Sequence, residues 1–339
     1  MQVKGWRVPV VALTGHLGAG KTTVLNQLLL NPGARIGVVV NDFGAINVDA
    51  GLLTGQVSTA ESIAGGCLCC LPDSGGLDEA LEVLTRPRLR LDAVVVEASG
   101  VAEPAALGRL IRFSGAEHVR PGGLVDVVDA DAYFATVDTG GDPPARFGAT
   151  TLVVINKTDL LPADEREPTV ERIRARVHER NPHAHVVVTT RGRVDPALVF
   201  DAATDHDPDD QLPLADLARE HAGPPHRHAN AVTVPATGPV DPGALIDLLE
   251  DPPAGVYRLK GTVVVDTGRT TRAYTANVVG RHIHIAPHPA TTGDGLVAIG
   301  THLNHADVHR RLQTALAAPS GPVAAQAMRR LVRYRRLSE

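Results

Sequence analysis

Gly15-His16-Leu17-Gly18-Ala19-Gly20-Lys21-Thr22 is the stretch that decides the fold. It fits G-x-x-x-x-G-K-[ST] without a gap, and it stands between an apolar run and a helix candidate. The three glycines let backbone N–H groups point inward at phosphate oxygens, and the start of the helix adds partial positive charge. Lys21 is expected to reach the β and γ phosphates and Thr22 to bind Mg²⁺. The residues expected to contact the phosphates are Gly15, Gly18, Ala19, Gly20, Lys21, Thr22 and Thr23.

Apolar runs and helix candidates alternate over the first 200 residues. The runs suit buried parallel strands, so the pattern is βαβ and predicts an α/β fold with a mostly parallel sheet. The expected strands are Val8 to Thr14, Ile36 to Asn41, Ala93 to Glu97, Gly123 to Asp129, Leu152 to Asn156 and His185 to Thr190. The expected helices include Lys21 to Leu30, Leu77 to Leu84 and Pro168 to Asn181.

The character of the chain changes near Phe200, and four regions are expected. A nucleotide-binding domain over residues 1–200 is followed by a linker over 201–230, which is rich in Asp, Pro and His. Residues 231–317 read as a smaller α+β domain, with helices at Pro242 to Glu250 and Ala306 to Ala317. Its expected strands begin at Ala231 and continue at Tyr257 to Asp266, Arg272 to Val279, His282 to Ala286 and Gly295 to Gly300.

Residues 318–339 form a basic C-terminal region, in which a helix is predicted over Val323 to Leu337. Five arginines on it make either a solvated basic face or a docking site for an acidic partner.

Composition limits the class of protein. With 339 residues and 43% hydrophobic residues, the chain is long enough for one large or two ordinary domains. No run approaches the roughly 20 apolar residues of a membrane helix, and the start leads into a strand rather than a signal-peptide cleavage region. A cytoplasmic protein without a membrane partner is therefore expected. A net charge of −5 and 3% aromatic residues argue against nucleic acid as a partner.

Asn156-Lys157-Thr158-Asp159 ends a predicted strand downstream of the phosphate loop. The Asp159 carboxylate can accept two hydrogen bonds from the N1 and exocyclic amine of guanine, a donor pair that adenine lacks. This rim of an open α/β sheet is where ligands bind, so GTP is predicted over ATP. Thr189 and Thr190 supply either a second base-contacting loop or a plain strand end.

Two further strand ends carry acidic residues. Glu97 closes one strand and is placed to act on Mg²⁺ or its water shell, while Gly100 lets backbone approach the γ phosphate. Asp42 follows another strand and offers a second carboxylate in a loop that could order around Mg·GTP, or else caps a turn.

The three cysteines, Cys67, Cys69 and Cys70, lie within four positions of one another. Thiolates suit Zn²⁺ and similar soft or borderline ions, and three of them leave a fourth position open, as suits a metal that is passed on. Buried inert cysteines and a redox role are the alternatives. Cys₃ chemistry allows Zn²⁺, Co²⁺ or Cu⁺.

Two groups of histidines have less certain roles. His221, His226 and His228 lie in the linker, where they either gather a metal ion or are simply solvated. His282, His284 and His288 lie on and just after a predicted strand and are either ordinary strand residues or a client-facing patch.

Together these motifs resemble the CobW-type metallochaperone GTPases, relatives of the GTPases that mature urease, hydrogenase and methylmalonyl-CoA mutase. The resemblance covers nearly the whole chain and is most specific at the CxCC segment. The matching stretches are GHLGAGKTT at 15–23, NDFG at 41–44 with Asp49, GGCLCC at 65–70, EASGVAEP at 97–104, NKTD at 156–159, YRLKG at 257–261 and VAIG at 297–300.

The resemblance implies that the three cysteines hold a transferred metal, most often Zn²⁺ or Co²⁺, for a client metalloprotein, and it allows for a homodimer. It also implies that Glu97 and Gly100 form the Walker B motif and that Asp42 stands where members more often carry Glu. Val40 and Ala45 replace Glu residues found beside this loop in many relatives, and the histidine stretch is shorter than in the most His-rich ones.

The expected function is therefore that of a GTP-hydrolysing metallochaperone. Its intrinsic hydrolysis is expected to be slow, because no Arg or Gln can be assigned to the transition state, and a missing finger residue costs on the order of 10³ to 10⁵ in rate. The alternatives are a cobalt-handling or nitrile-hydratase-activating GTPase, a non-catalytic metal buffer or sensor, and a small-molecule kinase.

Overall fold

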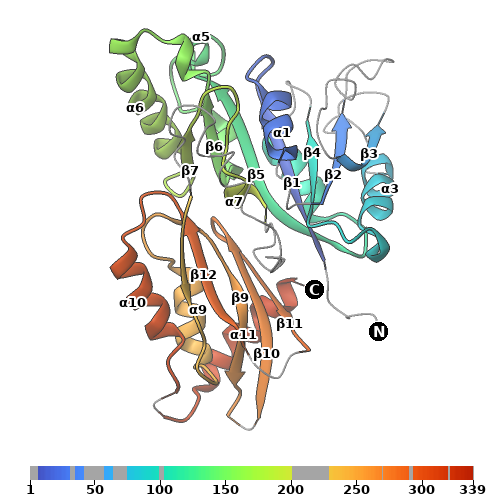
Figure 1. Cartoon of the computed structure of the whole chain (residues 1–339), viewed down its shortest axis with the longest axis vertical. Helices are drawn as coiled ribbons and strands as arrows, with labels where there is room; N and C mark the ends of the chain where they lie inside the picture. Colours follow the sequence, from blue (N-terminus) through green and yellow to red (C-terminus); the bar gives the residue numbers. More distant parts are fainter. Residues whose placement is uncertain are drawn as a thin grey trace, which may run out of the picture.

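The structure is a computed structural model that describes residues 7–30, 35–41, 57–63, 75–98, 103–200, 229–268, 270–289, 293–319 and 321–338. The first part of the chain builds a seven-stranded parallel sheet in the order β3-β2-β4-β1-β5-β6-β7 (Figure 1). The predicted mostly parallel sheet is confirmed. Its strands are β1 (Val8–Gly15), β2 (Ile36–Asn41), β3 (Val57–Ile63), β4 (Ala93–Glu97), β5 (Val119–Asp129), β6 (Leu152–Asn156) and β7 (His185–Val188).

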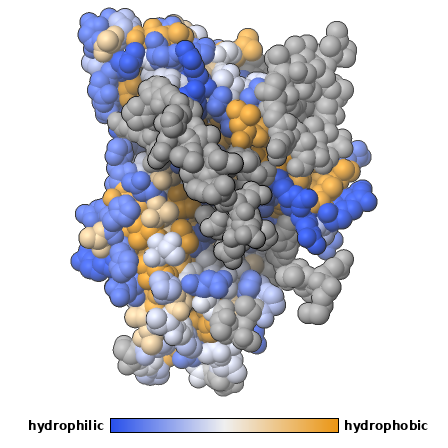
Figure 2. Space-filling model, viewed as in Figure 1, coloured by the Kyte–Doolittle hydropathy of each residue, from blue (hydrophilic) through white to orange (hydrophobic). Residues whose placement is uncertain are grey.

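Helices cover both faces of this sheet. They are α1 (Lys21–Leu29), α3 (Gly75–Leu84), α4 (Pro104–Arg112), α5 (Tyr133–Thr136), α6 (Ala163–Arg180) and α7 (Pro196–Val199), with 3₁₀ turns η2 (Pro87–Leu89), η3 (Ala145–Ala149) and η4 (Thr158–Leu160). Figure 2 shows hydrophilic side chains over the outer side of α6, as expected for a helix that packs on the sheet by one narrow side.

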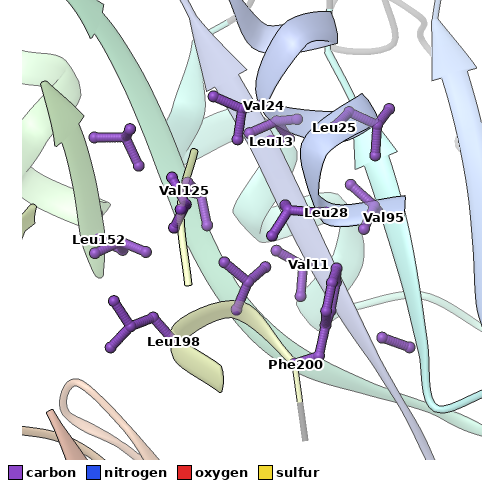
Figure 3. Close-up of a cluster of buried hydrophobic side chains, with 14 of the residues drawn as sticks. Val11, Leu13, Val24, Leu25, Leu28, Val95, Val125, Leu152, Leu198 and Phe200 are labelled. Atoms are coloured by element: carbon purple, nitrogen blue, oxygen red, sulfur yellow. The ribbon is translucent and has the colours of Figure 1, made fainter. Parts of the chain in front are cut away.

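Alternation along β1 divides the core into two layers. Val11 and Leu13 face α1, and Figure 3 shows Leu13 beside Val24 and Val11 between Leu28 and Phe200, the latter from the segment after β7. Val10 and its alternating neighbours face the opposite side, where α3 and α4 pack. Because β1 is buried on both faces, it reads as a continuous apolar run rather than an alternating one.

Several boundaries differ from the sequence expectation, among them those of β5, β7 and α6. β5 begins four residues before Gly123 and includes Pro121, and its register against β1 shifts at this point. A proline cannot donate to the ladder, which is why the sequence pattern begins after it. β7 ends at Val188, two residues earlier than expected, and α6 begins at Ala163, so that Pro168 lies inside the helix at the cost of one hydrogen bond.

The C-terminal unit is a five-stranded antiparallel sheet in the order β11-β10-β9-β12-β8, covered by three helices. The expected α+β class is confirmed, and the predicted bounds of α9 and β12 coincide with those observed. The elements are β8 (Asn230–Val234), α9 (Pro242–Glu250), β9 (Val256–Asp266), β10 (Thr271–Val279), β11 (His282–Pro287), β12 (Gly295–Gly300), α10 (His305–Ala315) and α11 (Ala325–Ser338).

The two units meet at the edge of the parallel sheet where β6 and β7 begin. The Tyr257 hydroxyl donates to Thr151 Oγ1 at 3.0 Å, and the Tyr257 ring stacks on His185 with 5.0 Å between centroids. His185 Nε2 also lies 3.0 Å from the Thr301 hydroxyl. Tyr257, Val279 and Ile299 of the C-terminal unit belong to the same buried cluster as the α1 layer, so the units share a core.

Some of the basic side chains of the C-terminal helix α11 form ion pairs within the protein. Arg330 forms ion pairs with Asp247 and Glu250 of α9, each at 2.7 Å, while Arg329, Arg333 and Arg336 are exposed. The five arginines are therefore not one uniform solvated face. Among the described residues, no helix is long and apolar enough to cross a membrane.

Candidate nucleotide-binding site

The loop from Gly15 to Lys21 connects β1 to α1 at the carboxyl edge of the sheet. Gly20 is the N-cap of α1 and has a left-handed backbone with φ 99°. A Cβ at this position would lie 2.5 Å from Asn156 Nδ2, so both the conformation and the space require glycine. Gly20 thus leaves room for the side chain of Asn156, which is more than 130 residues away in the sequence.

Lys21 lies over the loop that precedes it. Its Nζ donates to the carbonyl oxygens of Gly15 at 3.1 Å and His16 at 3.4 Å, and the side chain is almost fully buried. Ala19 is buried as well, whereas Gly18 and Thr23 are exposed. The ammonium is therefore held at the mouth of the loop, where a phosphate would be bound.

Thr22, in the first turn of α1, lies beside Glu97 at the end of β4. Thr22 Oγ1 donates to Glu97 Oε1 at 2.8 Å, and Glu97 is 3% exposed. Backbone pairing holds the carboxylate in place, since Leu13 pairs with Glu97 and the Ala98 N–H donates to the Leu13 carbonyl at 2.9 Å. Hydroxyl and carboxylate oxygens are the ligand types that Mg²⁺ prefers, so these two residues fit a magnesium site.

A buried ion pair lies beneath the phosphate loop. Asp126 of β5 is fully buried and accepts a hydrogen bond from Thr14 Oγ1 at 2.7 Å. Arg146 of η3 donates to both carboxylate oxygens, each at 2.7 Å. Burial alone would lower the pKa of Arg146, but its hydrogen bonds and charge interaction with Asp126 outweigh this and raise the pKa.

Sequence reasoning missed this pair. Its signal is an acidic residue inside the apolar run Leu124 to Asp129, where a buried charge requires a partner.

Asn156 joins the two loops expected to surround a nucleotide. Its Nδ2 donates to the Ala19 carbonyl at 3.1 Å, and its Oδ1 accepts from the Gly192 N–H at 3.0 Å. Thr158 Oγ1 donates to the Thr189 carbonyl at 3.2 Å, which ties the 156–159 segment to the end of β7. The structure therefore brings together the phosphate loop, the 156–159 segment and the segment that begins at Thr189, with Asp159 exposed at the rim.

Lys157 has a left-handed backbone, with φ 60°, and its Nζ forms a 2.7 Å ion pair with Asp129 at the end of β5. Neither Asp129 nor Gly192 was singled out from the sequence. Asp129 ends a predicted strand at the same rim as Glu97 and Asn156, and that position is the signal that could have identified it.

Several predicted residues lie outside the described part of the chain. They are Asp42, Gly100, Cys67, Cys69, Cys70, His221, His226 and His228. Of the other histidines, His282 is exposed, and His284 and His288 are half-buried. Within the described ranges, no group of three or more His, Cys, Asp or Glu side chains is arranged to hold a metal ion.

A glycine-rich loop between a buried strand and a helix, with a carboxylate at the end of the adjacent strand, defines a P-loop nucleotide-binding domain. The family model described as CobW/HypB/UreG, nucleotide-binding domain matches residues 9–188, and the model described as cobalamin synthesis protein cobW C-terminal domain matches residues 229–316. The chain belongs to the CobW/HypB/UreG family. The resemblance expected from its motifs is confirmed.

Three curated relatives show the extent of the likeness. "Zinc chaperone CobW" of Sinorhizobium sp is 29% identical over 75% of this chain and 81% of its own length. "Zinc chaperone YjiA" of Escherichia coli (strain K12) is 31% identical over 57% of this chain and 61% of its own length. "Zinc-regulated GTPase metalloprotein activator 1" of Schizosaccharomyces pombe is 31% identical over 56% of this chain and 47% of its own length. The match thus spans less than two thirds of the latter two relatives.

Two solved structures are also similar. The Zn(II)-bound YjiA GTPase from E. coli aligns with a TM-score of 0.42 and 20% identity over 91% of this chain and 99% of its own. HypB from Helicobacter pylori in complex with nickel aligns with a TM-score of 0.40 and 20% identity over 56% of this chain and 81% of its own. The strand order and the family models, rather than these scores, carry the fold assignment.

Proposed function

We propose that this chain is a GTP-hydrolysing metallochaperone that binds Zn²⁺ on Cys67, Cys69 and Cys70 and transfers it to a client metalloprotein. The observation that carries the proposal is the 2.8 Å hydrogen bond between Thr22 and Glu97 beside the phosphate loop. Relatives named zinc chaperone support the metal-handling part.

The described residues have distinct parts in nucleotide binding. The loop N–H groups and Lys21 bind the phosphates, for which Lys21 exchanges its contacts with the Gly15 and His16 carbonyls for phosphate oxygens. Thr22 and Glu97 would hold Mg²⁺, which supplies positive charge against the developing negative charge on the phosphates. Asp159 selects guanine through its two acceptor oxygens.

The order of strands supports coupling between nucleotide and metal. The cysteine segment follows β3, the Asp42 segment follows β2, and Glu97 ends β4. These strands are neighbours in the sheet and parallel to β1, so they end at the same edge as the phosphate loop. We propose that the GTP-bound state presents the metal to the client, and that hydrolysis relaxes the Asp42 and Glu97 segments so that coordination loosens.

The test combines metal binding with turnover. Zn²⁺ is titrated into the full chain in the presence of GDP or a non-hydrolysable GTP analogue, and transfer to a competing chelator is followed during hydrolysis. A nucleotide-dependent difference in zinc affinity is expected, and it should disappear in Lys21→Ala. Equal affinity and equal transfer in every nucleotide state would contradict the coupling.

The same measurements separate the rival functions. A metal buffer or sensor would retain its metal exchange and cellular function in Lys21→Ala, whereas a transfer GTPase loses both. A small-molecule kinase would prefer ATP and consume it only with an acceptor. Repeating the titration with Co²⁺ tests the cobalt-handling alternative, for which the affinity for Co²⁺ rather than Zn²⁺ would respond to the nucleotide.

A further inference from the structure

Asp129 stands at the carboxyl end of β5 directly beside the base-recognition segment. It pairs with Asn156 in the register of β5 and β6, and its Oδ2 lies 2.7 Å from Lys157 Nζ. The two side chains are 17% and 31% exposed, so the ion pair is only partly solvated. Its strength therefore exceeds that of a fully exposed pair.

The second oxygen of the same carboxylate is also engaged. Asp129 Oδ1 accepts from the backbone N–H groups of Asp131 at 3.1 Å and Ala132 at 3.4 Å. These bonds hold the orientation of the carboxylate independently of Lys157. The Asp129 carboxylate is thus fixed by the backbone of its own loop, and it in turn fixes the position of the Lys157 ammonium.

Lys157 needs such an anchor because its backbone is left-handed, at φ 60° and ψ 28°. A residue with a side chain adopts this conformation only when its surroundings impose it. Lys157 is the N-cap of η4, and its carbonyl accepts from the Leu160 N–H at 3.0 Å. Since Asp159 is the second residue of η4, the conformation at Lys157 determines where the expected guanine-selecting carboxylate stands.

We infer that Asp129 is a positioning residue for the base-recognition loop, acts through Lys157, and thereby sets the affinity for guanine nucleotides. The inference rests on the proposed function, because it takes Asp159 as the residue that selects guanine. If so, Asp129 at the end of β5 contributes to base recognition in addition to the 156–159 segment.

The test uses the full chain and the dissociation constants of fluorescent GDP and a GTP analogue. Asp129→Asn keeps an oxygen acceptor for the Asp131 and Ala132 N–H groups but removes the charge that holds Lys157. We expect about 3- to 10-fold weaker binding of both nucleotides, which corresponds to the loss of one partly buried ion pair. Turnover at saturating GTP should stay unchanged, and Asp129→Glu should restore part of the affinity.

A double-mutant cycle with Lys157→Gln distinguishes action through Lys157 from a general structural effect. If Asp129 acts through Lys157, Asp129→Asn has no further effect on affinity in the Lys157→Gln background. Additive losses would overturn the inference, and so would an unchanged affinity of the single Asp129→Asn variant. Thermal unfolding of each variant identifies a folding defect, in which case the cycle is completed with Asp129→Ser, which also removes the charge.

The matched control is Asp138→Asn, which breaks the ion pair between Arg176 Nε and Asp138 Oδ2 at 2.6 Å, a contact outside the candidate site. This control should retain the wild-type nucleotide affinity. Wild-type preference is measured first with GDP and ADP. A preference for ADP would contradict the proposed function itself, whereas a guanine preference with normal affinity in Asp129→Asn would contradict only the inference about Asp129.

Discussion

The Asn156 side chain donates a hydrogen bond to the Ala19 carbonyl at 3.1 Å, across 137 positions of the chain. The side-chain oxygen Oδ1 of Asn156 accepts a hydrogen bond from the Gly192 N–H at 3.0 Å. A single 2%-exposed side chain thus connects the phosphate loop to both segments expected to surround the base. The phosphate and base halves of the site therefore depend on one another.

Replacing Asn156 by Ala tests this dependence. The change leaves the buried Ala19 carbonyl and the Gly192 N–H without these partners, which costs about 1–3 kcal/mol per unsatisfied group. We expect a lower unfolding free energy in urea, and about tenfold weaker binding of GDP, because the segments that Asn156 connects are no longer held together and about 1.4 kcal/mol corresponds to a factor of ten. A variant with wild-type stability and affinity would show that the bridge is dispensable.

Gly20→Ala should be far more harmful to nucleotide binding than Gly18→Ala. Both glycines have positive φ, 99° and 79°, so both substitutions carry backbone strain on the order of 1–2 kcal/mol. Only at Gly20 does an added Cβ also collide with Asn156 Nδ2, at 2.5 Å, whereas nothing lies within 4 Å at Gly18. Calorimetric titration with GDP measures the difference, and equal losses would refute the role of the Asn156 contact.

Arg146→Met is predicted to destabilise the chain by about 3–5 kcal/mol, because it leaves the fully buried Asp126 carboxylate without its bidentate partner. Denaturant unfolding gives this value directly. The double variant Arg146→Met with Asp126→Leu should recover much of the loss, since no charge is then buried. If the single variant were as stable as the wild type, the pair would have no structural role.

The stability of the chain should fall on acidification through the titration of His185. Burial, followed by the nearby charges of His302, Arg174 and His178, lowers the pKa of His185 from 6.5 to about 4. The unfolded chain therefore binds a proton between about pH 6.5 and 4 that the folded chain does not. The contribution of neutral His185 is complete above this window and is lost as the pH falls to about 4.

Urea unfolding of the wild type and His185→Gln at pH 7.5 and 4.5 isolates this contribution. The wild type should lose more stability than the variant over this interval, by up to about 3 kcal/mol, because one pKa unit corresponds to about 1.36 kcal/mol. Parallel pH dependences in the two proteins would show that His185 titrates normally.

Local patterns were sufficient to predict the central strands and the phosphate loop. β2, β4 and β6 have the expected bounds because each is an apolar run flanked by polar residues. The confirmed family assignment also follows from contiguous motifs. The roles given to the individual site residues, and the four-region division of the chain, remain predictions.

Other features depend on contacts that no local pattern encodes. β3 has the sequence VSTAESI, which is too polar to stand out as a buried strand. Asp126 and Asp129 are recognisable as anchors only once Arg146 and Lys157, 20 and 28 positions away, are placed beside them. α4 could have been predicted from Pro104, since proline is favoured in the first turn of a helix.

The shared core between the two units has a consequence for any attempt to divide the chain. Val11 and Phe200 belong to the same buried cluster as Tyr257 and Ile299, so a fragment cut near residue 200 would present a bare apolar surface to water. Part of the hydrophobic core of the nucleotide-binding unit is therefore completed by side chains of the C-terminal sheet. The two sheets therefore cannot separate without exposing closely packed apolar side chains to water.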